Sequence, residues 1–142
     1  MLLLSVWVGV RIFSSIGFDR ACEGHLKRAA DANTVELAEK ELSKAVAYLE
    51  ANDMTEGFTS ILYETPDEDI GFWYSNLKAS QKELQGIPTE ATQLEKTNVL
   101  MKLRETLLDD SERGQKVTAP RGIHLYPINA VMAVFGWISF FI

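Results

Sequence analysis

The chain of 142 residues has the length of one domain, and its formal net charge is −6 at pH 7. This acidic balance argues against a nucleic-acid-binding protein, because phosphate binding needs a clustered basic face. The charge is unevenly placed: all Asp and Glu residues, and every Lys and Arg except Arg11, lie within residues 18–126. The sequence therefore predicts a soluble domain that is held at a membrane by both of its apolar ends.

Residues 1–17 are apolar apart from Arg11 and a few serines. A spanning helix needs ~20 mostly apolar residues, so this segment is slightly short. Arg11 would cost ~2.5–3.5 kcal/mol at the bilayer centre unless its side chain reaches the interface. It is either a functional intramembrane charge or a residue that simply lies near the interface. No basic residue precedes the run and no small-residue cleavage site follows it, so we expect an uncleaved N-terminal membrane anchor.

The polar middle of the chain contains strong helix signals. Residues 18–32 are expected to continue the first helix, with Gly24 as the one weakening residue. Asn33 and Glu36 have the spacing of a capping box, which predicts a helix over residues 34–51. Its apolar stripe steps by three and four residues and consists of Val35, Ala38, Leu42, Ala45 and Leu49. The link 53–64 is partly apolar and is expected to fold back over the end of the bundle.

Two more helices are expected in the polar middle. Thr65 as cap and Pro66 as first residue predict a helix over 66–85, which Gly86 ends. The Pro88-Thr89-Glu90 sequence predicts another over 89–113, ended by Gly114, and residues 117–126 are expected to form a loop or short strand. The predicted inward faces are Ile70, Trp73, Leu77 and Leu84 on the first, and Leu94, Leu100, Leu103, Leu107 and Leu108 on the second.

Residues 127–142 carry no charge and predict a C-terminal membrane helix that follows Pro127 and the cap Asn129. The chain stops inside this apolar run, without the polar flank that usually closes a span, so a truncated segment is expected. The predicted fold class is all-α: an antiparallel up-down helical bundle, residues 18–126, with hydrophobic N- and C-terminal membrane helices. The alternative is that both ends are buried helices of a soluble bundle.

The densest chemical cluster predicts a partner-binding surface at the start of the 66–85 helix. Acids and aromatics together could hold a cation or a basic partner. This surface consists of Asp67, Asp69, Tyr63, Phe72 and Tyr74. The simpler interpretation is helix capping plus core aromatics. A calcium loop is not expected, because it requires oxygen ligands at alternate positions and a turn glycine.

Catalytic, cofactor and metal sites are not predicted. Cys22 and His25 are one helical turn apart, and with His124 they could form a soft-metal site, but no spaced ligand motif supports one. Cys22 is the single cysteine and cannot form an internal disulfide. No nucleophile elbow or phosphate-binding glycine loop is present, so an enzyme is not expected. Glu105 and Asp109 are interpreted as a solvated helix face.

The stretches TPDEDIGFWYSNLKAS (65–80) and QLEKTNVLMKLRETLLDD (93–110) resemble an uncharacterised family of small bacterial membrane-anchored helical proteins. The resemblance covers about half of the chain and implies no activity or site residues. In layout, the anchor–bundle–anchor arrangement is also similar to the sensory domains of chemoreceptors, which is an analogy of fold alone.

The functional prediction is a membrane-anchored helical bundle that binds a protein partner or senses a small ligand. The alternative is a soluble obligate homo-oligomer whose apolar ends are buried between subunits. We expect the bacterial inner membrane, with the domain outside the cytoplasm by analogy with sensors. The basic residues that flank both apolar runs on the domain side favour the opposite, cytoplasmic placement. They are Arg20, Lys27, Arg28, Arg113, Lys116 and Arg121.

Overall fold

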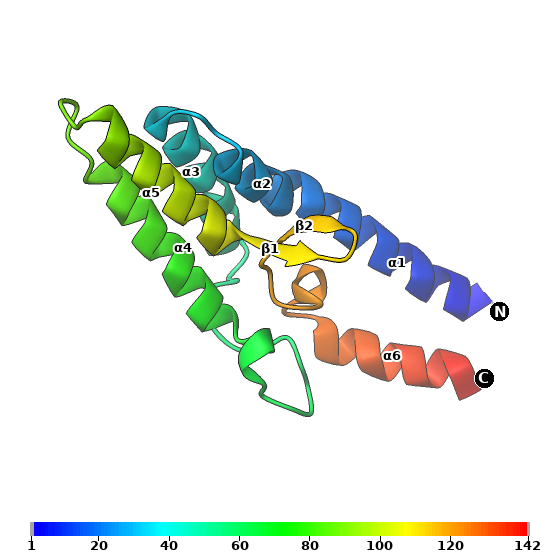
Figure 1. Cartoon of the computed structure of the whole chain (residues 1–142). Helices are drawn as coiled ribbons and strands as arrows, with labels where there is room; N and C mark the ends of the chain where they lie inside the picture. Colours follow the sequence, from blue (N-terminus) through cyan, green and yellow to red (C-terminus); the bar gives the residue numbers. More distant parts are fainter. Residues whose placement is uncertain (1, 142) are drawn as a thin grey trace.

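The computed structural model describes residues 2–141, and most of its regular structure is helical (Figure 1). One continuous helix of 29 residues is formed by α1 (Leu2–Phe18), a π-helical turn (Asp19–Glu23) and α2 (Gly24–Ala30). The other α-helices are α3 (Val35–Ala51), α4 (Ile70–Gln85), α5 (Gln93–Leu107) and α6 (Asn129–Phe141). The predicted extension of the first helix is confirmed. A Cβ atom at Gly24 would lie 2.9 Å from the Asp19 carbonyl oxygen, so the wide π-turn suits a glycine there.

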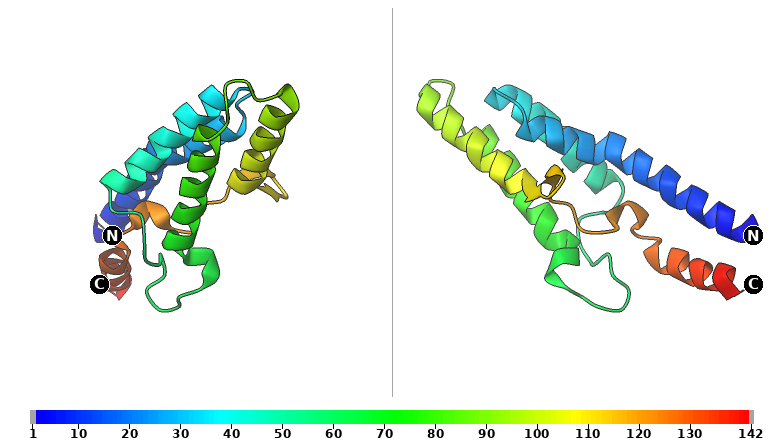
Figure 2. Two further views of the ribbon diagram at one scale, coloured as in Figure 1. Left: turned by 90° about the vertical axis from the view of Figure 1, so that its left-hand side faces the viewer. Right: turned by 45° about the vertical axis from the view of Figure 1, so that its right-hand side comes forward.

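The core lies between α2, α3, α4 and α5, which pack side by side and alternate in direction (Figures 1 and 2). The predicted stripe of α3 and the predicted inward face of α4 are buried throughout. On α5 the prediction fails at Leu94, which is 70% exposed, whereas Leu103 and Leu107 are buried. Leu94 lies in the first turn of α5, at the end of the bundle where few neighbouring residues remain to cover it.

The starts of α3, α4 and α5 lie later in the chain than predicted, because a different residue caps each of these helices. Thr34, rather than Asn33, caps α3 by accepting from the Leu37 amide at 3.2 Å. Pro66–Glu68 is a separate 3₁₀ turn, and α4 starts at Ile70 because the carboxylate of Asp69 accepts from the Phe72 amide at 2.9 Å.

The predicted helix 89–113 is wrong at both ends. Thr92 and Glu95 form a reciprocal capping box that starts α5 at Gln93. Beyond Leu107 the chain forms an antiparallel hairpin of β1 (Leu108–Ser111) and β2 (Gly114–Val117). Gly114 has φ +110°, which side chains disfavour, so it makes the hairpin turn rather than a helix end. The Thr118 amide donates to the Leu107 carbonyl oxygen at 2.9 Å, which occupies a free acceptor at the helix terminus.

The terminal helices α1 and α6 lie side by side, run in opposite directions and project from one end of the bundle (Figures 1 and 2). The start of α1 and the end of α6 therefore lie at the same tip. Phe18 is the one buried residue of α1 and contacts Tyr48 edge to face at 6.0 Å between ring centroids. The bundle covers neither terminal helix, in contrast to the alternative in which both are core helices.

Candidate functional site

The hydrophobic hairpin, defined here as α1 together with α6, contains most of the exposed large apolar side chains of the described residues. Soluble monomers rarely expose apolar patches larger than a few hundred Å², so such a surface typically contacts lipid or protein. Its exposed large side chains are Leu2, Leu3, Leu4, Val6, Val8, Val10, Ile12, Phe13 and Ile16 on α1, and Val131, Val134, Trp137, Ile138, Phe140 and Phe141 on α6.

The continuous helix Leu2–Ala30 is long and apolar enough to cross a membrane. Its most apolar 18-residue window has a mean hydropathy of 1.5, and 6% of that window is buried. α6 is also apolar but shorter, with 13 residues in the described part of the chain. These properties concern length and composition only, so the contacts between the two helices are the more specific observation.

Trp7 joins the two helices of the hydrophobic hairpin. Its indole Nε1 donates to the carbonyl oxygen of Met132 at 2.9 Å, and its ring faces Gly136. The guanidinium of Arg11 lies 4.9 Å from the centroid of the same ring, which is a cation–π contact. Burial lowers the pKa of His124, next to the base of the hairpin, and the charge of Arg11 lowers it further. Arg11 thus has a specific contact with Trp7.

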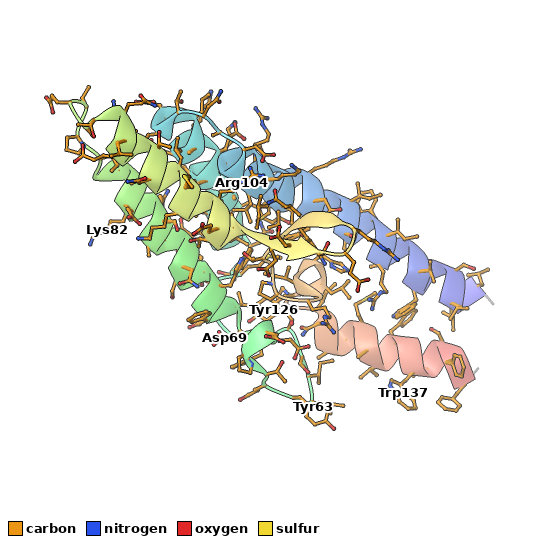
Figure 3. All side chains as sticks on the ribbon, in the orientation of Figure 1. Tyr63, Asp69, Lys82, Arg104, Tyr126 and Trp137 are labelled. Atoms are coloured by element: carbon orange, nitrogen blue, oxygen red, sulfur yellow. The ribbon has the colours of Figure 1, made fainter. Side chains whose placement is uncertain are left out.

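Three residues of the predicted partner-binding surface meet in one cleft. Asp67, Asp69 and Phe72 line a depression of about 550 Å³ between the start of α4, the end of α5 and the β-hairpin. Its size is typical of ligand sites, which range over ~300–1,000 Å³. Figure 3 places Asp69 at the start of α4. The cleft is therefore the part of the predicted surface that has a concave shape.

The cleft is mainly acidic and partly aromatic. Its charged lining residues are Asp67, Asp69, Glu105 and Asp109 on the negative side, and Lys116 and Arg121 on the positive side. The exposed ring of Phe72 lies on its rim, and the buried Trp73 contributes to its wall. Sequence reasoning missed Glu105 and Asp109 as site residues, because it placed both on a solvated helix face. The β-hairpin that turns Asp109 and Lys116 toward α4 was not predicted.

Tyr63 and Tyr74 lie outside the cleft. The Tyr74 hydroxyl donates to Glu50 on α3 at 2.6 Å, and this contact raises the pKa of Tyr74 to about 12. Tyr74 thus joins α4 to α3 and has a structural role. Tyr63 is on an exposed loop that Figure 3 places near the start of α6. The predicted surface therefore divides into three cleft residues and two tyrosines that lie elsewhere.

His25 belongs to an ionic cluster around the buried carboxylate of Glu41, and Cys22 is fully buried. The His25 Nδ1 atom lies 2.6 Å from the carboxylate of Glu41, which also contacts Lys44 at 3.0 Å and Arg28 at 3.5 Å. These partners, His25 first, lower the pKa of Glu41 to about 2. The cluster joins α2 to α3. Within residues 2–141 no group of three His, Cys, Asp or Glu side chains is arranged to hold a metal ion.

The chain was compared with protein-family models, curated proteins and solved structures. No family model, curated protein or solved structure matches it. The resemblance of residues 65–80 and 93–110 to small bacterial membrane-anchored proteins thus stays a prediction, and the functional argument rests on the geometry of the hydrophobic hairpin and the cleft.

Proposed function

We propose that this protein is a non-enzymatic helical domain, anchored in a bacterial membrane by the hydrophobic hairpin, that binds a cationic partner in the cleft. The observation that carries the proposal is the pair of apolar helices that pack on each other and that the bundle leaves largely exposed. Lipid can cover the outer faces of both helices, and a helix satisfies its own backbone hydrogen bonds in hydrocarbon. An anchor of this kind also explains the close contact of Trp7 with α6, since a cleaved signal sequence would be lost from the domain.

Arg11 is compatible with this anchor. A charged side chain in hydrocarbon is costly unless it reaches the interface or finds a partner. The guanidinium of Arg11 lies over the indole of Trp7, one helical turn away, and its charge affects His124 next to the base of the hairpin. We infer that Arg11 lies near the edge of the hydrocarbon region, within reach of the headgroups.

Carbonate extraction of bacterial membranes tests the anchor. The wild-type chain is expected to remain in the pellet. The double variant Val8→Asp/Ile12→Asp places two charges on the exposed face of α1, the part of the long helix that would cross the membrane, and is expected to move into the carbonate wash. The matched control Leu37→Asp/Leu94→Asp changes two exposed apolar residues of the bundle and is expected to remain in the pellet. Release of the wild-type chain into the wash would refute the anchor.

The alternative function, a soluble homo-oligomer that buries its hairpins between subunits, uses the same exposed surface. It predicts one defined oligomer in detergent-free buffer, with no affinity for lipid vesicles. The anchored protein is instead expected to aggregate or require detergent, and to float with phosphatidylcholine vesicles in a density gradient. Sedimentation velocity together with flotation distinguishes the two functions, because a soluble oligomer of defined size is not expected to float with vesicles.

The proposed partner of the cleft is a protein segment with an Arg or Lys side chain. Carboxylates and the exposed ring of Phe72 both favour a cation. The probe is a fluorescent arginine-containing hexapeptide, with its glutamate-containing counterpart as negative control. Asp67→Asn/Asp109→Asn is expected to weaken binding of the basic peptide, whereas Glu90→Gln/Glu112→Gln removes the same charge outside the cleft and is expected to preserve it. Equal losses in both variants would show that net charge, and not the cleft, attracts the peptide.

The orientation of the domain is a separate part of the proposal. By analogy with sensory domains we place it outside the cytoplasm, while the basic residues on the domain side favour the cytoplasm. Labelling of Leu94→Cys in intact cells with a membrane-impermeant maleimide decides between them, because Leu94 is exposed and Cys22 is buried. Labelling only after the cells are lysed would contradict the proposed orientation.

A further inference from the structure

The loop between α3 and α4 presents three consecutive apolar side chains to the outside. Ile61, Leu62 and Tyr63 are 50%, 83% and 72% exposed. This segment, the apolar loop tip (residues 61–63), was expected to fold back over the end of the bundle. The structure buries Met54 and Thr59 instead and leaves the tip uncovered.

Both sides of this loop are fixed near the base of the hydrophobic hairpin. The side-chain amide of Asn129, the first residue of α6, donates to the Thr59 carbonyl oxygen. The Tyr126 hydroxyl lies against Gly57, where a Cβ atom would be 2.7 Å away. On the other side, the Thr59 amide donates to the Glu68 carbonyl oxygen at 3.0 Å. The loop is therefore held between the start of α4 and the start of α6.

The loop projects from the bundle beside the first turn of α6, on the side of the molecule where the hydrophobic hairpin leaves it (Figures 1 and 2). Figure 3 shows Tyr63 at the outer end of this loop. The Tyr63 amide donates to the Ser60 hydroxyl at 3.1 Å, which shapes the turn before the tip. If the hairpin lies in lipid, the apolar loop tip lies at the level where the membrane surface begins.

We propose that the apolar loop tip is a second membrane contact, which inserts between lipid headgroups beside the hydrophobic hairpin. This inference rests on the proposed anchoring of the hairpin. Two aliphatic side chains followed by a tyrosine suit the interface, because a tyrosine ring can lie in the apolar region while its hydroxyl stays hydrated. The flanking acids Glu56, Glu64 and Asp67 give no attraction to anionic lipids, so the contact is expected with zwitterionic vesicles.

A second contact restricts the orientation of the domain on the membrane. Because α1 continues into α2 as one helix, the hairpin and the bundle tilt together, and the hairpin alone does not fix this tilt relative to the membrane surface. The loop is bonded to the start of α4 through the Thr59–Glu68 contact, and the same end of α4 provides Asp67 and Asp69 to the cleft. The lipid contact of the loop would therefore hold the cleft at one height and angle above the membrane surface.

Site-specific fluorescence tests this contact in the full chain. An environment-sensitive NBD dye is attached to Leu62→Cys, to Val134→Cys on the hairpin, and to Leu94→Cys, another exposed leucine at the far end of the bundle. The protein is mixed with phosphatidylcholine vesicles with and without nitroxide-labelled lipid. Wild-type protein carried through the same labelling measures any reaction of the buried Cys22.

We expect a blue shift and nitroxide quenching at positions 62 and 134, and neither effect at position 94. If position 134 responds and position 62 resembles position 94, the loop contact is wrong while the anchor stands. If positions 134 and 62 are both unaffected, the anchor itself is wrong and the inference falls with it. A blue shift at position 62 that depends on protein concentration without vesicles would identify a second copy of the chain as the occupant and overturn the proposal.

Discussion

The indole of Trp7 on α1 lies directly against Gly136 on α6. A Cβ atom added at Gly136 would lie 3.0 Å from the Nε1 atom of Trp7. Such a close approach is the reason that small residues are common where two membrane helices pack. The Trp7 Nε1 atom also donates to the Met132 carbonyl oxygen, one turn earlier in α6. The ring of Trp7 on α1 and the glycine at position 136 on α6 therefore position the two helices of the hydrophobic hairpin relative to each other.

Gly136→Leu is expected to separate α1 from α6. The new side chain would occupy the space of the Trp7 ring, and overpacking of this kind costs about 1–3 kcal/mol. The matched control is Gly9→Leu, because Gly9 is on α1 with no atom within 4 Å of its Cβ position. Spin labels at Leu3→Cys and Ile138→Cys measure the distance between the helices in detergent. A broadened distribution is expected for Gly136→Leu alone; equal broadening in both variants would show that the Trp7–Gly136 contact is not decisive.

Glu41→Gln is expected to destabilise the bundle by ~1.5–3 kcal/mol, the usual size of a lost hydrogen bond to a charged group. Glu41 is 4% exposed, and its carboxylate is surrounded by His25, Lys44 and Arg28. The glutamine preserves the volume but removes the charge that these partners stabilise. The control Glu36→Gln changes an exposed acid in the first turn of the same helix, where the helix dipole effect is ~0.3–1 kcal/mol. Urea unfolding in detergent, followed by circular dichroism, compares the two variants.

Acid is expected to weaken the bundle through the same residue. The pKa of Glu41 is lowered from 4.5 to about 2, so the folded state favours its charged form. A group whose pKa is lower in the folded state stabilises that state fully at pH values above its pKa in the unfolded chain. This stabilisation is lost as the pH falls toward the pKa of the group in the folded state. The free energy of unfolding should therefore decrease between about pH 5 and pH 2, and Glu41→Gln should flatten that decrease. Parallel curves for the wild type and the variant would exclude Glu41 as the cause.

Local signals predicted the buried faces of α3 and α4 well, because a stripe at helical spacing depends only on neighbours in sequence. The contacts that define the hydrophobic hairpin were not predictable in this way: Trp7 and Met132 are 125 residues apart, and no periodicity in one helix identifies its partner. The sequence predicted only some of the residues that line the acidic cleft. Asp67, Asp69 and Phe72 are close in sequence. Glu105 lines the cleft from α5, which packs against α4, and Asp109 reaches it because the chain turns into a β-hairpin after Leu107.

The start of α5 is the clearest case of two competing local signals. Thr89 follows Pro88 and precedes an acid, as in many helix starts, whereas Thr92 has Glu95 three residues later. The structure uses the second pair. The Thr92 hydroxyl accepts from the Glu95 amide at 3.2 Å, and the Glu95 carboxylate accepts from the Thr92 amide at 2.7 Å.

Thr92→Ala is expected to cost ~0.5–2 kcal/mol of stability, the usual effect of removing a helix cap. The same change three residues earlier, Thr89→Ala, is expected to stay within ~0.5 kcal/mol, since Thr89 contributes a backbone oxygen to Lys96 and that oxygen is unaffected. Urea unfolding measures both differences. Amide hydrogen exchange adds a local test, because loss of the cap should accelerate exchange in the first turn of α5 and leave α4 unchanged. A larger effect at Thr89 would mean that the helix begins at Pro88.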